Sequence, residues 1–205
     1  MTSLRADQPT LPPLMTVEAF FDWPGDGTET RYDLYEGAPR AMAPASPVHG
    51  LIQANAARMF GNHLVAAGRR CPVMTEAALT PRLGADINLR IPDVVVTCAP
   101  LAAHDRVVAE PLLIVEVLSP SNERVTQGNV WSYSSIPSVR EILLLRSDRV
   151  QAEVATKDAD GVWPVCRQVY LAGSSLTLES IGLTAAVEDF YALTPLLDDP
   201  DAASG

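Results

Sequence analysis

A run of apolar residues from Leu112 to Leu118 constrains the fold more than any other part of the chain. Its sequence, LLIVEVL, places apolar side chains on both faces of an extended strand and contains one acid, Glu116. A strand that is apolar on both faces has to be covered on both, which is typical of the centre of a sheet. The run therefore predicts an α/β or α+β domain in which helices flank a mixed central sheet.

Two longer helices are expected on either side of this strand. The first follows Ser46, a good N-cap with Pro47 at the tolerated first position, and continues to about Ala67 before Gly68. Its apolar residues recur at a spacing of three to four, as in an amphipathic helix. The second helix is predicted over residues 123–134, with Asn122 as its N-cap, and a short helix over 16–21.

Alternating or continuous apolar segments predict the strands of the sheet. They fall at residues 73–79, 86–89, 93–98, 112–118, 139–145, 150–155 and 162–169, with a shorter strand over 176–180 and a helical turn over 189–193. Residues 31–35 and 38–42 are expected to form a hairpin around Glu36-Gly37, because glycine accepts the positive φ of a tight turn.

The length of 205 residues suits one domain, which we place at residues 15–196. The proline-rich residues 1–14 and the acidic residues 197–205 are expected to be flexible ends. No apolar run approaches the roughly 20 residues of a membrane helix, and no signal-peptide core precedes the domain. We therefore expect a cytoplasmic protein without a membrane partner.

The three cysteines, Cys71, Cys98 and Cys166, are odd in number and far apart in the sequence. This spacing fits neither a CxxC zinc site nor a disulfide framework. All three are predicted to be free, at least partly buried thiols.

The net charge of −10 lowers the expectation of strong DNA binding. Phosphate neutralisation by basic side chains supplies most of the affinity of a DNA-binding protein. Fifteen residues are Lys or Arg, and Lys157 is the only lysine among them. The chain is therefore short of the residue type that many phosphate-processing sites use.

Two acids stand where an acid is costly: Asp93 at the start of a β-rich segment, and Glu116 inside the apolar strand. An unpaired buried carboxylate costs several kcal/mol or stays protonated. One or two carboxylates completed by waters are typical ligands of Mg²⁺, which would relieve this cost. Two simpler readings remain open: Asp93 as a strand-start residue, and Glu116 paired with Arg90 or Arg140.

Several segments resemble the Uma-two family of bacterial endonucleases, within the PD-(D/E)xK restriction-endonuclease-like superfamily. The matching segments are YDLYEG from Tyr32, the helix that begins near His49, IPDVVV from Ile91, and PLLIVEVLSPS from Pro111, followed by Tyr133 and IPSVREI from Ile136. The resemblance covers about residues 16–195 and implies a restriction-endonuclease-like fold. The EVLSPS segment is specific, whereas the Pro-Asp pair alone is not.

The resemblance implies a metal site. In the family, acids at the positions of Asp93 and Glu116 hold Mg²⁺ or Mn²⁺, and a histidine at the position of His49 points toward them, so these three residues are the expected metal ligands. Asp33 and Glu36 match acids of the family's hairpin, although Glu36 also suits a plain turn. Gln53, one helical turn after His49, is expected to face the same cleft.

The family's lysine is missing from this sequence. Two residues after Glu116 stands Leu118, and the alternative family position, four residues before Tyr133, is Asn129. Lys157 falls in a predicted solvated turn, so Asn129 or Arg124 is expected in the lysine's role. Arginine stays protonated and binds phosphate bidentately, while asparagine orients a water without supplying a charge.

Three functions remain open from the sequence. The first is a metal-dependent DNA endonuclease that uses Asp93, Glu116, His49 and Asn129, and the resemblance adds an expected homodimer. The second is a catalytically impaired relative that binds metal, nucleic acid or a partner protein without efficient cleavage. The third is a purely structural module, which gives no reason for Glu116 to stand in an apolar strand. The tryptophans Trp23, Trp131 and Trp163 are predicted to be packing residues.

Overall fold

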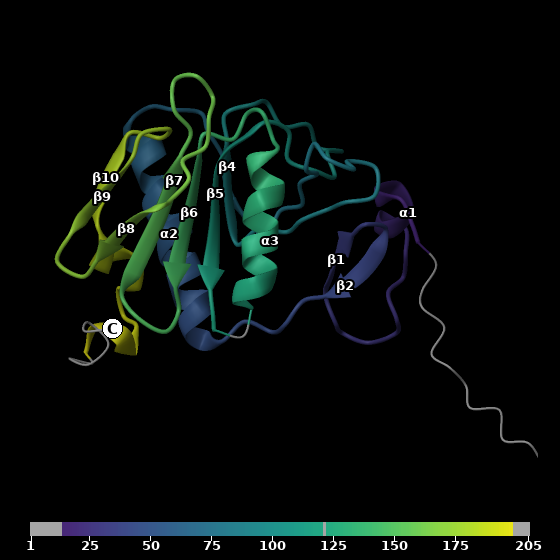
Figure 1. The fold of residues 1–205 in the computed structure, drawn as a ribbon, viewed down its shortest axis with the longest axis horizontal. Helices are drawn as coiled ribbons and strands as arrows, with labels where there is room; N and C mark the ends of the chain where they lie inside the picture. Colours follow the sequence, from purple (N-terminus) through teal and green to yellow (C-terminus); the bar gives the residue numbers. More distant parts are fainter. Residues whose placement is uncertain (1–13, 121, 199–205) are drawn as a thin grey trace, which may run out of the picture.

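A six-stranded sheet forms the centre of the protein in a computed structural model that describes residues 14–120 and 122–198 (Figure 1). Its strands lie in the order β3-β4-β5-β6-β7-β8. Their bounds are β3 Val73–Thr75, β4 Val94–Thr97, β5 Pro111–Leu118, β6 Glu141–Arg146, β7 Gln151–Thr156 and β8 Gln168–Leu171. Only β5 and β6 pair in parallel, and the other neighbours are antiparallel. The predicted mixed sheet, with β5 inside it, is confirmed.

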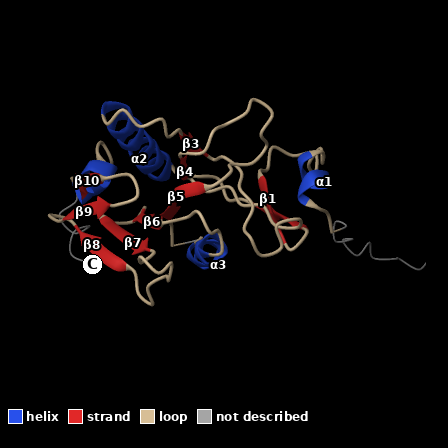
Figure 2. Ribbon diagram, turned by 90° about the horizontal axis from the view of Figure 1, so that it is seen from above, coloured by secondary structure: helices blue, strands red, loops and turns tan. Residues whose placement is uncertain are grey.

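The helices α2 (Pro47–Ala66) and α3 (Glu123–Ser134) cover opposite faces of this sheet (Figure 2). The Ser46 hydroxyl caps α2 by accepting a hydrogen bond from the His49 backbone N–H at 3.2 Å. Satisfying such an otherwise unpaired N–H is worth about 1 kcal/mol. The cap sets the start of α2 and thereby fixes where the His49 side chain leaves the helix.

Side-chain alternation along β5 divides the core into two halves. Leu113, Val115 and Val117 pack on the α2 side, whereas Ile114 and Leu118 pack on the α3 side with Tyr133 and other residues. Glu116 lies between Ile114 and Leu118 with the same period of two. It therefore occupies a core position on the α3 face, where an apolar side chain would be the ordinary choice.

Smaller elements lie at the two ends of the molecule (Figure 1). On the side of α3 away from β8 lie α1 (Val17–Phe21) and the hairpin of β1 (Tyr32–Tyr35) and β2 (Ala38–Ala41). Near β8 lie β9 (Ser175–Leu178), β10 (Leu183–Ala186), η1 (Val187–Tyr191) and η2 (Pro195–Leu197). The hairpin turns at Glu36 and Gly37, both with positive φ (49° and 78°). This is the tight turn that the Glu-Gly pair predicts.

Several predicted elements are shorter than expected or absent. Residues 86–89 form a turn in which only Leu89 makes an isolated bridge, so a strand there is wrong. The strand predicted over 162–169 begins only at Gln168. Trp131 was expected to pack but is 65% exposed on α3. In each case the apolar residues matched the local pattern of a strand or of a packed side chain. The position of the neighbouring elements decided whether a strand or a contact formed.

The prediction of three free thiols is wrong for two of the cysteines. Cys71 and Cys98 form a disulfide, and Cys166 is free and exposed. Val73 pairs with Val96 and Thr75 with Val94, so the same register carried outward places Cys71 opposite Cys98. Pairing of β3 with β4 therefore brings together two cysteines that are 27 positions apart in the sequence.

Both predicted flexible ends fall largely outside the described residues, which exclude 1–13 and 199–205. Leu197 is an exception, because it closes η2. Within residues 14–120 and 122–198, no helix is both long enough and apolar enough to cross a membrane.

Candidate active site

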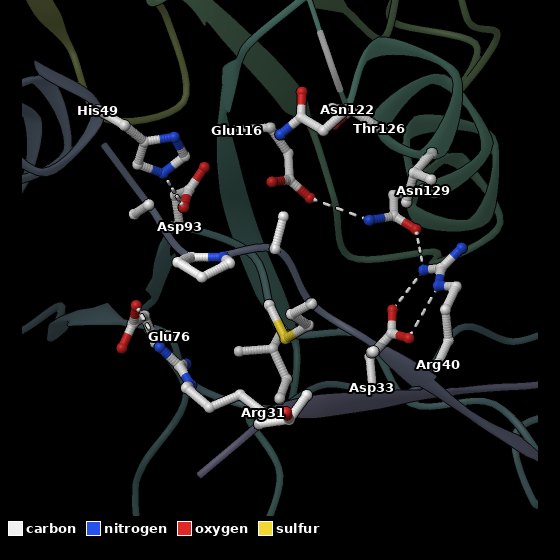
Figure 3. Close-up of a pocket in the computed structure, with 18 of the residues that line it drawn as sticks. Arg31, Asp33, Arg40, His49, Glu76, Asp93, Glu116, Asn122, Thr126 and Asn129 are labelled. Atoms are coloured by element: carbon white, nitrogen blue, oxygen red, sulfur yellow. Dashed lines mark hydrogen bonds and ion pairs between the residues drawn. The ribbon is translucent and has the colours of Figure 1, made fainter. Parts of the chain in front are cut away.

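A cavity of about 570 Å³ lies between the β1–β2 hairpin, the start of α2, the start of β4, the middle of β5 and one face of α3 (Figure 3). Five segments that are far apart in the sequence thus line one cavity. The charged side chains that line the cavity are Glu29, Arg31, Asp33, Arg40, His49, Glu76, Asp93 and Glu116. Three of the four predicted site residues are among them, and the fourth, Asn129, lines the cavity as well.

Asp93 is held on both of its carboxylate oxygens. One oxygen lies 2.8 Å from Nε2 of His49, and the other accepts a hydrogen bond of 2.6 Å from the backbone N–H of Val117. Gln53, expected at the same cleft, donates its side-chain amide to the Asp93 carbonyl at 3.0 Å. These contacts tie β4, β5 and α2 together at one point, and they fix the direction of the carboxylate.

Glu116 is 6% exposed and accepts its hydrogen bonds from α3. The Tyr133 hydroxyl donates to Oε1 at 2.5 Å, and the Asn129 amide approaches the same oxygen at 3.5 Å. Burial, and after it the charge of Asp93, raises the pKa of Glu116 well above its ordinary value. Burial also raises the pKa of Tyr133, which keeps its hydroxyl a donor. The suggested pairing of Glu116 with Arg90 or Arg140 is wrong: Arg90 binds the carbonyls of Leu34 and Leu89, and Arg140 is exposed whereas Glu116 is buried.

Asp93 and Glu116 are the two carboxylates in this cavity whose oxygens could hold a divalent cation. Asp93 lies close enough to Glu116 that its charge raises the pKa of the Glu116 carboxyl. Positive charge between them would offset both the desolvation of Glu116 and its repulsion by Asp93. Two carboxylates with waters are a usual Mg²⁺ ligand set. In the described parts of the chain, no group of three or more His, Cys, Asp or Glu side chains is arranged as a metal site.

His49 stands next to Asp93 rather than apart from it, with both side chains largely buried (12% and 15% exposed). A histidine hydrogen-bonded to a carboxylate commonly orients that carboxylate. Its role as a direct metal ligand stays a prediction, because its Nε2 contacts the Asp93 carboxylate.

The other candidates divide clearly. Asp33 lines the cavity, whereas Glu36 occupies the exposed hairpin turn. Arg124 is exposed on α3 and does not line the cavity. Lys157 lies elsewhere, where its ammonium group donates to the Pro137 carbonyl at 3.2 Å and stacks on Trp163.

Two site residues were missed as such from the sequence, Tyr133 and Arg40. Tyr133 follows Asn129 by four positions in α3, and residues at that spacing share one helix face. Arg40 stands directly opposite Asp33 in the hairpin register, which follows from a two-residue turn at Glu36-Gly37. Both positions were therefore available from spacing once the hairpin and the helix were accepted.

Comparisons with known proteins agree with this fold. The sequence matches the Uma2 family, described as "Putative restriction endonuclease", over residues 17–188. The uncharacterised protein slr1290 of Synechocystis sp. is 32% identical over 189 residues, which are 91% of this chain and 96% of that protein.

A crystal structure described as a "putative nuclease belonging to DUF820" from Anabaena variabilis superimposes with a TM-score of 0.66 at 17% identity. The match covers 87% of this chain and 98% of that one, so the restriction-endonuclease-like fold is confirmed. With the family match spanning most of the described residues, the chain belongs to the Uma2 family of restriction-endonuclease-like proteins.

Proposed function

We propose that this protein is a metal-dependent DNA endonuclease, with weak or conditional activity because the family's lysine is replaced. The observation that carries the proposal is Glu116, a nearly buried carboxylate in a core position beside Asp93. Such an arrangement destabilises the metal-free fold. It is better explained by a ligand than by packing, because an apolar residue would serve the core better at this position.

The chain's own residues would prepare the site in three ways. Val117 and His49 fix the two oxygens of Asp93, and Tyr133 fixes one oxygen of Glu116. A Mg²⁺ or Mn²⁺ ion bound by Asp93 and Glu116 would supply water activation and stabilise charge on the scissile phosphate. Asn129, on the same wall, would orient a water or a phosphate oxygen but could not accept a proton as a lysine amine does.

A second function is favoured by two other observations. The residue at the lysine position is neutral, and the net charge is −10. Both favour a protein that binds metal, nucleic acid or a partner without efficient cleavage. In that case metal and DNA binding would persist while phosphodiester hydrolysis would be absent.

The test of the proposed function is nicking of supercoiled plasmid in Mn²⁺, Mg²⁺ or EDTA by the wild type and by Asp93→Asn. Asparagine can still accept from Val117 and contact His49, so the fold is expected to persist while the charge is lost. We expect wild-type nicking that requires metal, and a loss of about 10²–10³-fold in the variant, as when one preorganised electrostatic contact is removed.

The control for this assay is Glu179→Gln, which removes an exposed carboxylate outside the cavity. Equal nicking by the wild type and Asp93→Asn would contradict the proposed active site. No nicking by the wild type, with Mn²⁺ still bound in calorimetry, would favour the binding function.

DNA as substrate, a homodimer that cuts two strands and a cytoplasmic location remain parts of the proposal. Sedimentation with and without duplex DNA would test the first two.

A further inference from the structure

Arg40 reaches the candidate site from the hairpin. Its Nε donates to Asp33 at 2.9 Å, and its Nη2 binds the second oxygen of the same carboxylate. Asp33 is 5% exposed and Arg40 28% exposed, so this pair is mostly withdrawn from water. A bidentate arginine–carboxylate pair fixes the plane of the guanidinium group. The hairpin thus presents Arg40 as a rigid group rather than as a mobile surface side chain.

The same guanidinium crosses to α3. Nη2 of Arg40 donates to Oδ1 of Asn129 at 2.9 Å (Figure 3). Arginine has donors only, so it selects the oxygen end of the Asn129 amide. The nitrogen end must then face the other way, and it points to Oε1 of Glu116 at 3.5 Å. A continuous chain of contacts therefore runs from Asp33 through Arg40 and Asn129 to Glu116.

The charges around the cavity single out Arg40. The two lysine or arginine residues in the cavity wall are Arg31 and Arg40. Arg31 pairs with Glu76 at 2.8 Å, and both side chains are about half exposed (52% and 43%). An exposed ion pair of this kind contributes little to stability. Arg40 is the cation that is both largely buried and connected to the two-carboxylate site.

We propose that Arg40 is the positioning residue that replaces the family's missing lysine. It holds the Asn129 amide with its N–H groups toward Glu116, and it brings a permanent positive charge to the wall that a phosphate diester would contact. Because arginine stays protonated, Arg40 acts through orientation and charge and not through proton transfer. This inference rests on the proposed nuclease function. It places the positive charge of the family's lysine on the hairpin, whereas the family position at Asn129 lies on α3.

The experiment compares two changes that remove the link with one that restores the lysine. Arg40→Met alone leaves Asp33 buried without its partner, so the working variant is Asp33→Asn with Arg40→Met, which removes both charges. We expect this double variant to nick plasmid about 10–100-fold more slowly in Mn²⁺, the range typical of losing a hydrogen-bond partner that orients a group at a metal site. The loss is expected in kcat. Adding Asn129→Lys to it places an ammonium group beside Glu116 and should restore most of the rate.

The control is Arg106→Met, which removes an exposed arginine that pairs with Asp22 outside the cavity. A readout independent of cleavage is the side-chain amide of Asn129 in ¹H–¹⁵N spectra. The wild type should show one ordered amide with slowed hydrogen exchange, and the Asp33→Asn, Arg40→Met variant should lose that protection. This measurement decides the role of Arg40 even if the wild type cuts no DNA.

Three outcomes would overturn the inference. One is a double variant that nicks at the wild-type rate while Asp93→Asn is inactive. This result would leave the proposed nuclease function intact and would contradict only the role of Arg40. Another is an Asn129 amide that is equally protected with and without Arg40. Failure of Asn129→Lys to raise the rate in the double variant would also count against the replacement of a lysine.

Discussion

Replacing Glu116 with glutamine is expected to lower metal-dependent plasmid nicking by about 10²–10³-fold. Glutamine keeps the size of the side chain and can still accept the hydrogen bond from Tyr133 that glutamate accepts at 2.5 Å. Only the negative charge is removed, so the loss would be one of metal binding and electrostatics. Initial nicking rates in Mn²⁺ measure it, with Glu179→Gln as the exposed control. A Glu116→Gln protein that nicks at the wild-type rate would contradict the assignment.

The same substitution is expected to stabilise the metal-free protein, by about 1–3 kcal/mol at neutral pH. Burial and the neighbouring Asp93 raise the pKa of Glu116 well above 4.5. The folded state therefore binds the Glu116 proton more tightly than the unfolded state does. Protonation of Glu116 thus stabilises the folded state, and this contribution is complete below about pH 4.5. It is lost as the pH rises through the folded pKa, and Glu116→Gln lacks that decline.

Urea denaturation of both proteins between pH 4 and 8 measures the difference. Saturating Mn²⁺ should offset it, because a ligand at 100 times its Kd stabilises the folded wild type by about 2.7 kcal/mol. A variant that is less stable than the wild type across this range would mean that Glu116 is a structural residue rather than a strained ligand.

Reduction of the Cys71–Cys98 disulfide is expected to destabilise the protein by about 3–4 kcal/mol. The bond closes a loop of 27 positions and thus restricts the unfolded chain. It joins the end of β4 at Cys98, whereas Asp93 precedes the start of β4. The reduced protein should therefore keep its site where it remains folded. Lower stability and retained nicking are expected together.

Denaturation with and without a reductant, beside the Cys71→Ser, Cys98→Ser variant, measures this effect. The variant should match the reduced wild type and should not respond to reductant. Thiol titration of the denatured, unreduced protein should find one thiol, Cys166, and three after reduction. Three thiols before reduction in freshly purified protein would contradict the bridge. Since disulfides persist mainly in oxidising compartments, the count also bears on the expected cytoplasmic location.

Local patterns in the sequence predicted most of the framework. The apolar strand, the Ser46 cap and the Glu36-Gly37 turn each depend on a few neighbouring residues, and all three are confirmed. The short strand β3 and the false strand at 86–89 depend on which segments pair across space. A short apolar run carries no information about its partner, so pairing could not be read from it.

The residues of the candidate site likewise fall into those that are visible in the sequence and those that only the fold brings together. Asp93 and Glu116 stand out because each is a charge beside apolar residues, and that contrast is visible in the sequence. The disulfide and the contact of Arg40 with Asn129 join positions 27 and 89 apart. Those contacts exist only after β3 meets β4 and the hairpin meets α3. Arg40 is remote from α3 in the sequence, so the positions around α3 that include Asn129 and Arg124 carry no sign of it.

The central claim is that Asp93 and Glu116 together bind one divalent cation. Calorimetric titration of the metal-free wild type and of Glu116→Gln with Mn²⁺, at a pH where both are folded, tests it most directly. We predict one Mn²⁺ bound per chain in the wild type and at least about a 10–100-fold weaker affinity in the variant. Equal binding by the two proteins, or no binding by the wild type, would contradict it.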